Sequence, residues 1–467
     1  MNNDLKFSRF AHFWKKNGVI AAFHALNRQV LFFSPKLLSS IKSFLSITSR
    51  DASKKSVIVA QSIRELKNCE LLVPIAEKEE RGIERLQKMI LSRPCIDTLY
   101  LILTDNCNFD CTYCFFEGSY NSPETRSDTM SNVTAMSAIQ RFTAYLRRAY
   151  NFPDFHPQDP SIIFYGGEPL LNLKVFYSIV KEINRLKKCK QLPLNLSVSV
   201  NTNGSLITSE IAAFCVDHKI EVDVSLDGYE SVNDKCRIWE ESRKGTFSAI
   251  MRGISILQKS GAKTCISCTI SESNVDELPM VLEWFLDELG IDQVGFNPLL
   301  DSPEYQVQDP GYSAKAAQAM IDCFKIARER GIHEHRIMRK IKAFVNGQLY
   351  DRDCSGCGRQ IVVRPDGKFG VCHAFSGTGE FFVKPGYGFS PYAHPFWKEW
   401  SNRSPLNMLQ CYDCEALTIC GGGCPHNAYL KTGSIWGIDK SFCVHAKETI
   451  QWLIWDLYKQ TQKSENS

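Results

Sequence analysis

The sequence has no long hydrophobic run and almost no excess of charge of either sign. Its 467 residues include 55 Lys and Arg against 51 Asp and Glu, which gives a net charge of +4. No stretch reaches the roughly 18 uncharged apolar residues that a membrane-spanning helix requires. A nucleic-acid-binding protein would carry a basic stripe, and so small an excess does not supply one. We therefore expect neither a membrane nor a nucleic acid as a partner.

Repeats, low-complexity segments and a secretory signal are also missing. The first twenty residues contain no continuous apolar core and no small-residue cleavage site. Apolar residues make up 44% of the chain and charged residues 23%, which excludes wholesale disorder and leaves ample surface for a core. At roughly 150 residues per domain, two or three domains are expected. We predict a cytoplasmic protein.

Strands and helices alternate regularly across residues 96–305. Apolar, β-branched runs predict six strands, at residues 98–103, 161–165, 196–200, 222–226, 264–270 and 293–297. Helical patterns lie between them, at residues 133–150, 173–186, 209–218, 247–260 and 275–289. This alternation builds right-handed parallel units, and six strands are too few for a closed eight-stranded barrel. The sequence therefore predicts an α/β fold with a partial (β/α)6 barrel of the TIM type.

Three further regions are predicted around that barrel. Residues 1–95, with a hairpin over 19–33, indicate a small N-terminal α+β domain. Residues 306–349 form a helical connector. Residues 350–467 form a Cys-rich domain with Gly and Pro turns, and they end in an amphipathic helix at 447–458. Further helical spacing occurs at residues 35–45, 83–91, 314–330 and 336–346.

Cysteine is the residue type that stands out. Nineteen cysteines in 467 residues are too few for a short disulfide scaffold, and no secretory signal accompanies them. Tightly spaced cysteines in a cytoplasmic chain are more often metal ligands or catalytic groups than bridges. Eight of the nineteen fall between Cys354 and Cys443. That clustering indicates where the chemistry lies.

Directly after the first predicted strand stand Cys107, Cys111 and Cys114, in the spacing CxxxCxxC. Three thiolates so close together can hold one iron–sulfur cluster, which normally takes four Cys ligands, so one iron stays open to a small molecule. The position also fits, since functional groups of parallel barrels lie at the carboxyl ends of strands. A zinc knuckle, or three unrelated cysteines, is the alternative.

Three more motifs follow later strands: YGGEP at 165–169, NTNG at 201–204 and SLDG at 225–228. Together with the cysteine loop, they resemble the radical S-adenosylmethionine (SAM) enzymes, whose three cysteines hold a [4Fe–4S] cluster while SAM chelates the open iron. The resemblance implies that the SAM amino group is held by Gly166, Gly167 and Glu168, and the glycines allow close backbone approach. It implies further SAM contacts by Tyr113, Asn203, Ser225, Arg237 and Leu300.

The C-terminal cysteines form a second array, which is numerous enough for two complete four-ligand sites. A zinc ribbon is the alternative for such CxxC pairs. The array resembles the SPASM domain of peptide-modifying radical SAM enzymes. That resemblance implies a first auxiliary [4Fe–4S] cluster on Cys354, Cys357, Cys372 and Cys424, and a second on Cys411, Cys414, Cys420 and Cys443. Because the two sets interleave, metal binding and folding of this region should be coupled.

The remaining eight cysteines show no cluster spacing, and we expect them to be small buried hydrophobic residues. They are Cys69, Cys95, Cys189, Cys215, Cys236, Cys265, Cys268 and Cys323. The sequence assigns no catalytic acid or base. Glu117, Asp301 and His373 merely lie near the predicted barrel mouth or a cluster.

The resemblance also implies the reaction. Reduction of the barrel cluster, by an electron donor such as a flavodoxin or ferredoxin, would cleave SAM to methionine and a 5′-deoxyadenosyl radical that abstracts hydrogen from a C–H bond. Relatives with SPASM domains act mostly on peptides, which they cross-link, epimerise or, in the sulfatase maturases, oxidise. Sulfatase maturases carry Asp directly after the cysteine that matches Cys372, whereas this chain has His373. Sulfatase maturation is therefore a lower-ranked alternative.

Residues 17–35 and the helical pattern that follows resemble the PqqD-like precursor-recognition element, which captures leader peptides by strand addition. This resemblance implies a precursor peptide as the partner, with its leader on residues 1–95. The alternative is a helical extension that packs on the barrel.

We therefore predict a radical SAM/SPASM maturase that installs a cross-link, of C–C, ether or thioether type, in a ribosomally synthesised precursor peptide. Two other hypotheses stay open. One is a radical SAM oxidoreductase that acts on a small molecule, and the other is a non-catalytic, zinc-structured scaffold that binds peptides.

Overall fold

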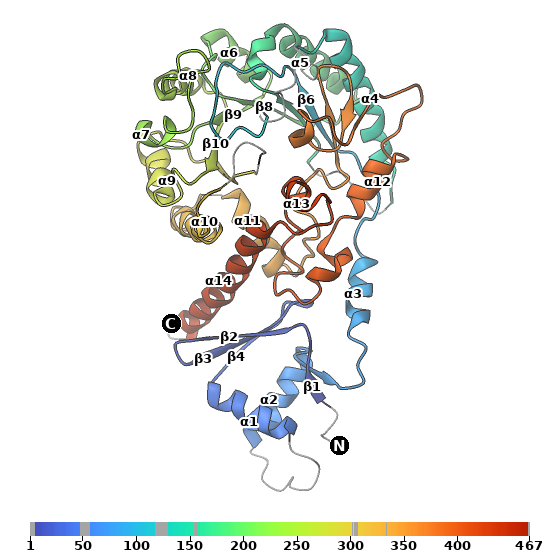
Figure 1. Ribbon diagram of the computed structural model, residues 1–467, viewed down its shortest axis with the longest axis vertical. Coiled ribbons are helices and arrows are strands. Elements are labelled where there is room, and N and C mark those ends of the chain that lie inside the picture. The colour runs from blue at the N-terminus through green and yellow to red at the C-terminus, as the bar shows by residue number, and fades with distance from the viewer. Residues whose placement is uncertain are drawn as a thin grey trace.

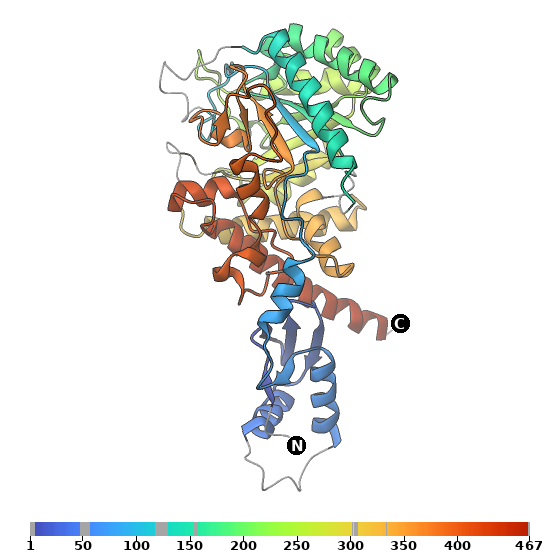
Figure 2. The same ribbon diagram turned by 90° about the vertical axis from the view of Figure 1, so that its right-hand side faces the viewer.

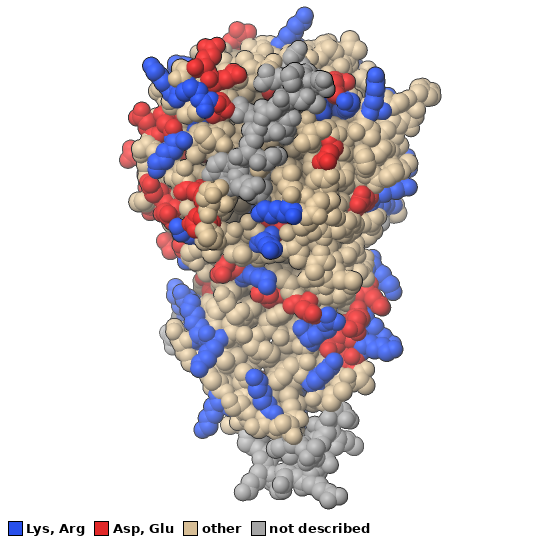
Figure 3. Space-filling view, in the orientation of Figure 1, with Lys and Arg blue, Asp and Glu red and all other residues tan. Residues whose placement is uncertain are grey.

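The structure is a computed structural model, shown in two views in Figures 1 and 2. It describes residues 5–46, 57–116, 129–153, 157, 159–300, 302, 307–332 and 334–465. Within these ranges, none of the helices combines the length and the apolar character needed to cross a membrane. On the face shown in Figure 3, Lys and Arg lie among Asp and Glu, and acidic side chains gather along the left-hand edge of the upper half. That face carries no continuous basic stripe.

The core of the molecule is a nine-stranded sheet in the order β11-β10-β9-β8-β7-β6-β12-β13-β14. Six of these strands pair in parallel with their neighbours in chain order. They are β6 (Thr98–Ile102), β7 (Ser161–Tyr165), β8 (Ser197–Thr202), β9 (Glu221–Ser225), β10 (Thr264–Ile270) and β11 (Val294–Pro298). The predicted α/β fold with a partial (β/α)6 barrel is confirmed.

Helices cover the outer face of these strands (Figure 1). They are α4 (Asn132–Tyr150), α5 (Leu173–Lys188), α6 (Ser209–Asp217), α7 (Glu230–Asn233), α8 (Phe247–Ser260) and α9 (Leu278–Asp287). Each strand alternates between this covered face and the barrel interior. In β9, Val222 and Val224 are fully buried against the helices, while Asp223 and Ser225 point the other way and are half-buried. The alternation leaves polar side chains on the inside of the barrel.

Two connector helices, α10 (Tyr312–Glu329) and α11 (His335–Val345), lead from the barrel to the Cys-rich region. That region then adds three short strands to the barrel sheet: β12 (Gln360–Val363), β13 (Phe369–Gly370) and β14 (Phe382–Val383). Strand β12 lies parallel to β6, and the other two strands continue antiparallel. The sheet therefore continues from the barrel into the Cys-rich region, which the sequence pattern did not predict.

The last part of the chain contains α12 (Pro395–Asn402), α13 (Pro425–Thr432) and α14 (Lys440–Glu465). The sequence predicted the final helix only over 447–458. Helix α14 is 26 residues long and begins early enough to contain Cys443. It packs on α10, where the Phe324 and Trp452 rings meet edge to face with centroids 5.5 Å apart. The predicted start was wrong because the first turns of α14 face the cysteine region and lack a simple apolar period.

The N-terminal unit consists of β1 (Leu5–Phe7), β2 (Ala11–Lys16), β3 (Val19–His24), β4 (Val30–Phe33), α1 (Pro35–Ser46), α2 (Val57–Asn68), β5 (Leu72–Pro74) and α3 (Glu80–Gln87). Strands β2, β3 and β4 form an antiparallel sheet, which includes the predicted hairpin. Strand β1 pairs with β5. The helix predicted at 83–91 begins and ends earlier, at Glu80 and Gln87.

Strand β3 is buried on both faces, which attaches the N-terminal unit to the rest of the molecule. Ala21 and Phe23 pack in a core with Leu417 and Trp455 of the C-terminal region. Ala22, between them, faces the separate core under α1 and α2. Figures 1 and 2 both place this unit at the end of the long axis opposite the barrel. It packs on the Cys-rich region and α14, so the alternative of a helical extension on the barrel is wrong.

Candidate active site

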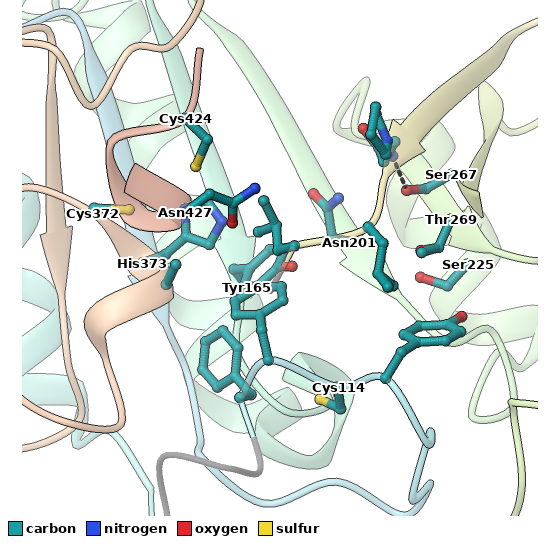
Figure 4. Close-up of a pocket in the computed structure, with 18 of the residues that line it drawn as sticks. Cys114, Tyr165, Asn201, Ser225, Ser267, Thr269, Cys372, His373, Cys424 and Asn427 are labelled. Atoms are coloured by element: carbon teal, nitrogen blue, oxygen red, sulfur yellow. Dashed lines mark hydrogen bonds between the residues drawn. The ribbon is translucent and has the colours of Figure 1, made fainter. Parts of the chain in front are cut away.

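A cavity of about 1350 Å³ lies where the carboxyl ends of the barrel strands face the Cys-rich region. Its wall includes the three-cysteine loop, the ends of β7 to β11, and part of the C-terminal cysteine array. Figure 4 shows Cys114 and Ser225 on one side of this cavity and Cys372 and Cys424 on the other, with Tyr165 between them. The fold therefore brings the two predicted cysteine sites to one space.

The loop after β6 carries Cys107, Cys111 and Cys114, all partly exposed and all lining the cavity. Several donors approach their sulfurs, and the amide of Phe109 lies 3.4 Å from Cys107 Sγ. Asn203 Nδ2 lies 3.9 Å from Cys107 Sγ, and Arg237 Nη1 lies 3.9 Å from Cys111 Sγ. Such donors favour thiolates over thiols, because charge-assisted hydrogen bonds stabilise the anion. Burial, and then the nearby Glu168, nevertheless raise the pKa of Cys107, and the Phe109 amide opposes that shift. Binding of an iron–sulfur cluster by this loop would therefore release protons.

Gly166 and Gly167 line the same cavity at the end of β7. Gly166 has φ +148°, and a Cβ there would lie 2.3 Å from the Thr104 carbonyl oxygen. A Cβ on Gly167 would lie 2.3 Å from the Asn106 carbonyl oxygen. No other residue fits at either position, since the two backbones touch. The glycines thereby bring the YGGEP backbone against the loop that carries the cysteines.

Glu168 points away from that space. Glu168 is not among the described residues that line the cavity. Its carboxylate accepts hydrogen bonds from Leu170 N, Thr202 Oγ1 and Asn203 N at 2.7–3.0 Å. Burial raises the pKa of Glu168 to about 7, although these three donors oppose the shift. In this structure the side chain ties the end of β7 to the end of β8. A direct contact between Glu168 and SAM stays a prediction.

A residue that the sequence reasoning left unassigned, Asp227, organises the side chains beside the three-cysteine loop. Arg237 donates to it from Nη2 at 3.0 Å, and the amide of Thr269 donates at 2.9 Å. The Tyr113 hydroxyl donates to the other carboxylate oxygen. Arg237 also lies over the Tyr113 ring, 5.5 Å from its centroid. Asp227 therefore fixes two of the predicted SAM contacts, and its position in the SLDG motif was the available signal.

The other predicted SAM contacts, Asn203, Ser225 and Leu300, all line the cavity. Beside them runs a row of polar side chains on the inner face of the sheet, which the sequence reasoning missed: Asn201, Ser267, Thr269 and Asn297. Figure 4 shows the Ser267 hydroxyl accepting a hydrogen bond, which comes from Asn297 Nδ2 at 3.0 Å. Strict polar–apolar alternation in the predicted strands was the signal for these residues.

The eight C-terminal cysteines come together in two groups. Burial, and then the neighbouring thiols Cys354, Cys424 and Cys357, raise the pKa of Cys372. Burial, and then Cys420, Cys414 and Cys411, raise the pKa of Cys443 to about 12. These neighbours are the partners that the SPASM resemblance implies. Because the thiols are protonated at neutral pH, metal binding there would release protons.

The loop that joins the two groups consists of glycines. Gly421, Gly422 and Gly423, between Cys420 and Cys424, all have positive φ, from +69° to +85°. A Cβ on Gly421 would lie 2.5 Å from the backbone nitrogen of Asp353. This tight left-handed path lets consecutive cysteines enter different groups, and it needs glycine at each step.

A fully buried guanidinium, that of Arg403, fastens the glycine loop. It donates to the carbonyl oxygens of Gly422 (2.8 Å), Gly423 (3.3 Å) and Gly437 (3.3 Å). Its charge also lowers the pKa of thiols in both groups, against the larger opposing effect of burial at Cys357 and Cys411. Arg403 therefore lies between the two groups of cysteines.

In this structure the sulfurs of the cluster cysteines are not gathered as closely as four thiolates around one zinc ion. Four thiolates around one zinc ion, at Zn–S of about 2.3 Å, lie about 3.8 Å apart. Within the described residues, the one group of three potential ligand atoms mutually within 4.8 Å is Glu221, Asp223 and Cys265, at the amino ends of β9 and β10. All eleven cysteines of the predicted cluster sites are described, so no three of their sulfurs are that close.

The remaining cysteines are mostly buried, as expected. Cys189 is an exception because it is exposed, and Cys69 is half-buried. His373 lines the cavity and stacks on Tyr100, with centroids 4.9 Å apart, so it forms part of the wall. Glu117 and Asp301 lie outside the described residues.

Comparison with known proteins agrees with this geometry. Residues 101–285 match the family model of the Radical SAM superfamily. The radical SAM cyclopropyl synthase TigE of Paramaledivibacter caminithermalis is 24% identical over 392 residues, which cover 81% of this chain and 77% of that protein. A cysteine-type anaerobic sulfatase-maturating enzyme of Clostridium novyi is 25% identical over 342 residues, covering 69% and 86% of the two chains.

Two solved structures share the fold. The structure of anSMEcpe with bound AdoMet superposes with a TM-score of 0.64 at 20% identity, covering 78% of this chain and 99% of that one. Streptococcus suis SuiB bound to S-adenosylmethionine superposes with a TM-score of 0.50 at 14% identity, covering 94% and 99%. The chain therefore contains a radical SAM domain, over residues 101–285. Its cofactors are SAM and the [4Fe–4S] cluster.

Proposed function

We propose that this chain is a peptide maturase that cleaves SAM reductively and installs a cross-link in a ribosomally synthesised precursor. The observation that carries the proposal is the single cavity. It is lined by the three-cysteine loop and the SAM-facing motifs on one side, and by Cys354, Cys372 and Cys424 on the other. A substrate held there can meet a radical source and a second redox centre at once.

In this proposal the three-cysteine loop holds the cluster that binds SAM, and that cluster supplies the electron for SAM cleavage. The chain's own residues position the cofactor. The backbone of Gly166 and Gly167 approaches the SAM amino group, while Ser225 and Arg237 contact its ribose or carboxylate. Arg237 is pre-oriented by Asp227 on one side and by the Tyr113 ring on the other. Leu300 and Tyr113 flank the adenine.

The C-terminal cysteines hold two auxiliary clusters in the proposal, one on each of the two groups described above. Such clusters are fully ligated by protein and suit the transfer of electrons. The group of Cys354, Cys372 and Cys424 lies closest to the substrate space, because these three residues line the cavity. The other group lies further from it. This arrangement gives the electron released on closing a cross-link a route away from the substrate.

A peptide substrate is supported by two relatives. SuiB has been solved bound to the precursor peptide SuiA, and anSMEcpe bound to the Cp18Cys peptide. In this chain, the N-terminal unit offers a site for a leader peptide, since β2 and β4 are the edge strands of its three-stranded sheet. An extended leader can add to such an edge.

The direct test uses anaerobically reconstituted protein with SAM, dithionite and a precursor peptide encoded beside the gene. Formation of 5′-deoxyadenosine together with a peptide that has lost two hydrogens supports the proposal, because closing a C–C, ether or thioether link removes two hydrogens. SAM cleavage without any change in peptide mass contradicts it. Deleting residues 1–95 should abolish binding of the leader while SAM cleavage persists.

Sulfatase maturation is the second candidate, because sulfatase-maturating enzymes are among the relatives. The feature against it is His373, where that activity calls for an Asp base. The His373 ring packs against the rings of Tyr100 and Tyr165, with centroid distances of 4.9 Å and 5.1 Å. Incubation with a sulfatase-derived peptide that contains the target Cys or Ser, assayed for the aldehyde product, decides between the two.

A further inference from the structure

Helix α11 carries a lysine whose ammonium group is completely buried and makes no hydrogen bond. Lys340 is 0% exposed, and Nζ has no hydrogen-bond partner among the described residues. The ammonium lies 4.6 Å from the ring centroid of Phe442 and 5.5 Å from that of Tyr350. A buried charge without hydrogen bonds is costly unless a counter-charge compensates it. Burial lowers the pKa of Lys340, and Asp353 and then Cys420 oppose that shift. Negative charge close to Lys340 is therefore what keeps its ammonium protonated.

The carboxylate beside Lys340 is shared with two other cations. Asp353 Oδ1 lies 3.8 Å from Lys340 and 3.9 Å from Arg339, and Oδ2 lies 3.8 Å from Arg336. All three distances exceed the length of a hydrogen bond. The hydrogen bond that Asp353 does accept, at 2.8 Å, comes from the Tyr350 hydroxyl. One carboxylate therefore faces three cations.

Two more titratable groups face this cluster. Glu334 caps the start of α11. Its carboxylate accepts hydrogen bonds from the amides of Arg336 and Ile337, so it interacts mainly with the amino end of that helix. Burial, and then the neighbouring Lys340, hold the pKa of His445 well below its usual value, so His445 adds no charge. Three cations and two carboxylates leave one positive charge uncompensated.

The space for the missing negative charge lies toward Cys420 and Cys443. Phe442, whose ring faces the Lys340 ammonium, directly precedes Cys443, and the Asp353 amide donates to the carbonyl oxygen of Gly421, next to Cys420, at 3.0 Å. Lys340 is absent from the described residues that line the cavity, so it does not meet a substrate there. A [4Fe–4S] cluster on four thiolates is an anion, and one-electron reduction adds a further negative charge. A cluster at Cys420 would supply the counter-charge that the protein lacks.

We propose that Lys340 is the charge partner of a cluster held by Cys411, Cys414, Cys420 and Cys443, and that its ammonium raises the reduction potential of that cluster. This inference rests on the proposed function, which assigns an auxiliary cluster to these cysteines. A fixed cation at short range stabilises the reduced form more than the oxidised form, because the reduced form carries more negative charge. The electron itself comes from an external donor, such as a flavodoxin, a ferredoxin or dithionite.

Lys340 can be tested more cleanly than Arg403, the other buried cation near these thiols. Arg403 donates hydrogen bonds to several backbone carbonyls, so removing it also removes the support of the glycine loop. Lys340 makes no hydrogen bond, and methionine has a similar length and volume. Replacing a buried ion with an apolar side chain of similar volume is often neutral for stability.

The experiment is a redox titration of the reconstituted full chain, monitored by electron paramagnetic resonance. A Cys111→Ala background removes the signal of the barrel cluster and leaves the auxiliary signals. In that background Lys340→Met should shift one auxiliary midpoint potential to a more negative value and leave the other nearly unchanged. Lys342→Met is the matched control, because Lys342 is exposed on the same helix and should shift neither. An unshifted potential in Lys340→Met with full iron content overturns the proposal.

A second variant covers the case in which Lys340→Met loses iron. Asp353→Asn removes the carboxylate that Lys340 now shares, so the effective positive charge grows and the potential should become more positive. A potential that is unchanged or more negative in Asp353→Asn overturns the proposal. Lys340→Arg, which keeps the charge, should stay close to the parent protein and thereby separates charge from packing.

Failure of the proposed function gives a different result. Three clusters correspond to about twelve iron atoms per chain, at about four per cluster. If the Cys411 group holds no cluster, iron and sulfide analysis shows the deficit before any potential is measured, and the proposed function fails. If iron is complete and Lys340→Met leaves the potentials unchanged, the inference about Lys340 fails alone.

Discussion

The two cysteine regions hold their thiols in opposite ways. Cys107, Cys111 and Cys114 come from one short loop, and all three are partly exposed at the cavity. The C-terminal set comes from segments spread over residues 354–443, where Cys357, Cys372 and Cys420 are buried, the other five cysteines are partly exposed, and a crowded glycine loop joins the groups. A loop with three thiols leaves one position of a four-ligand cluster for an exchangeable ligand. Eight thiols in two groups of four leave no such position, and because distant segments supply them, metal binding and folding of the region should be coupled.

The largest difference between the regions should appear in SAM cleavage. Cys111→Ala removes one of three ligands from a site with no spare thiol, so 5′-deoxyadenosine should become undetectable, with a loss of about four iron atoms per chain. Cys414→Ala should leave SAM cleavage in place and abolish the modified peptide. Cys189→Ala is the matched control, since Cys189 is exposed and outside both regions. Equal loss of SAM cleavage in the Cys111 and Cys414 variants would remove the distinction.

A glycine substitution should damage the C-terminal region selectively. Gly421→Ala puts a Cβ 2.5 Å from the Asp353 backbone nitrogen at a positive φ, so the loop must move and both auxiliary clusters should be lost. Gly433→Ala also has a positive φ but meets nothing within 4 Å, so it should cost only about 1 kcal/mol. Iron analysis and thermal unfolding of the two variants measure the contrast. Normal iron content in Gly421→Ala would show that the loop tolerates the movement.

On the barrel side, replacing Asp227, which orients Arg237, should weaken SAM binding. Asp227→Asn removes the counter-charge of the buried Arg237, which should destabilise the folded protein by about 3 kcal/mol. Because the charge-assisted hydrogen bonds that orient Arg237 are worth about 1.5–3 kcal/mol, their loss should weaken SAM binding roughly 10- to 100-fold. Asp287→Asn breaks an exposed ion pair with Arg330 and should change binding very little. Calorimetric titration of SAM into both holoenzymes gives the comparison. Retained affinity in Asp227→Asn, with full iron, would argue that Arg237 does not contact SAM.

The sequence predicted the barrel well because its signal is local. Strands β7 and β10 and helix α8 have the predicted bounds, since alternation and helical spacing are read within a few residues. The pairing of β12 with β6 was not predicted. Gln360–Val363 is one polar residue followed by three apolar ones, and so short a pattern does not indicate a partner strand far away in the chain. Local pattern identifies an element, whereas tertiary packing selects its neighbour.

For the candidate site, too, the sequence predicted only part of the arrangement. The motifs predicted which residues gather at the cavity, because carboxyl ends of parallel strands meet at one edge. They did not predict the direction of each side chain. Glu168 turns into the strand ends and Asp227 turns toward Arg237, although both belong to motifs of similar appearance. Hydrogen-bond partners from other strands decide these orientations, and those partners are not neighbours in sequence.

The smallest expected effect lies in the N-terminal unit, away from both cysteine regions. His24 is 2% exposed, and its Nδ1 accepts from the amide of Asn27. Burial lowers its pKa to about 4, against the opposing charges of Glu70 and Glu79. Because the unfolded state binds the proton first, the free energy of unfolding should fall as pH drops from about 6.5 to about 4, by at most about 3 kcal/mol.

His24→Gln removes this titration, so the pH dependence of thermal unfolding should be flatter in the variant than in the parent protein. Comparing the two proteins at each pH cancels the protonation of cluster ligands, which is common to both. SAM cleavage and the iron content should stay the same in both, because His24 contacts Ser8, Phe10 and Asn27 within the N-terminal unit. Parallel pH profiles would mean that His24 is protonated at the same pH in the folded and unfolded chains, and a drop in iron would show that the N-terminal unit supports the cysteine array.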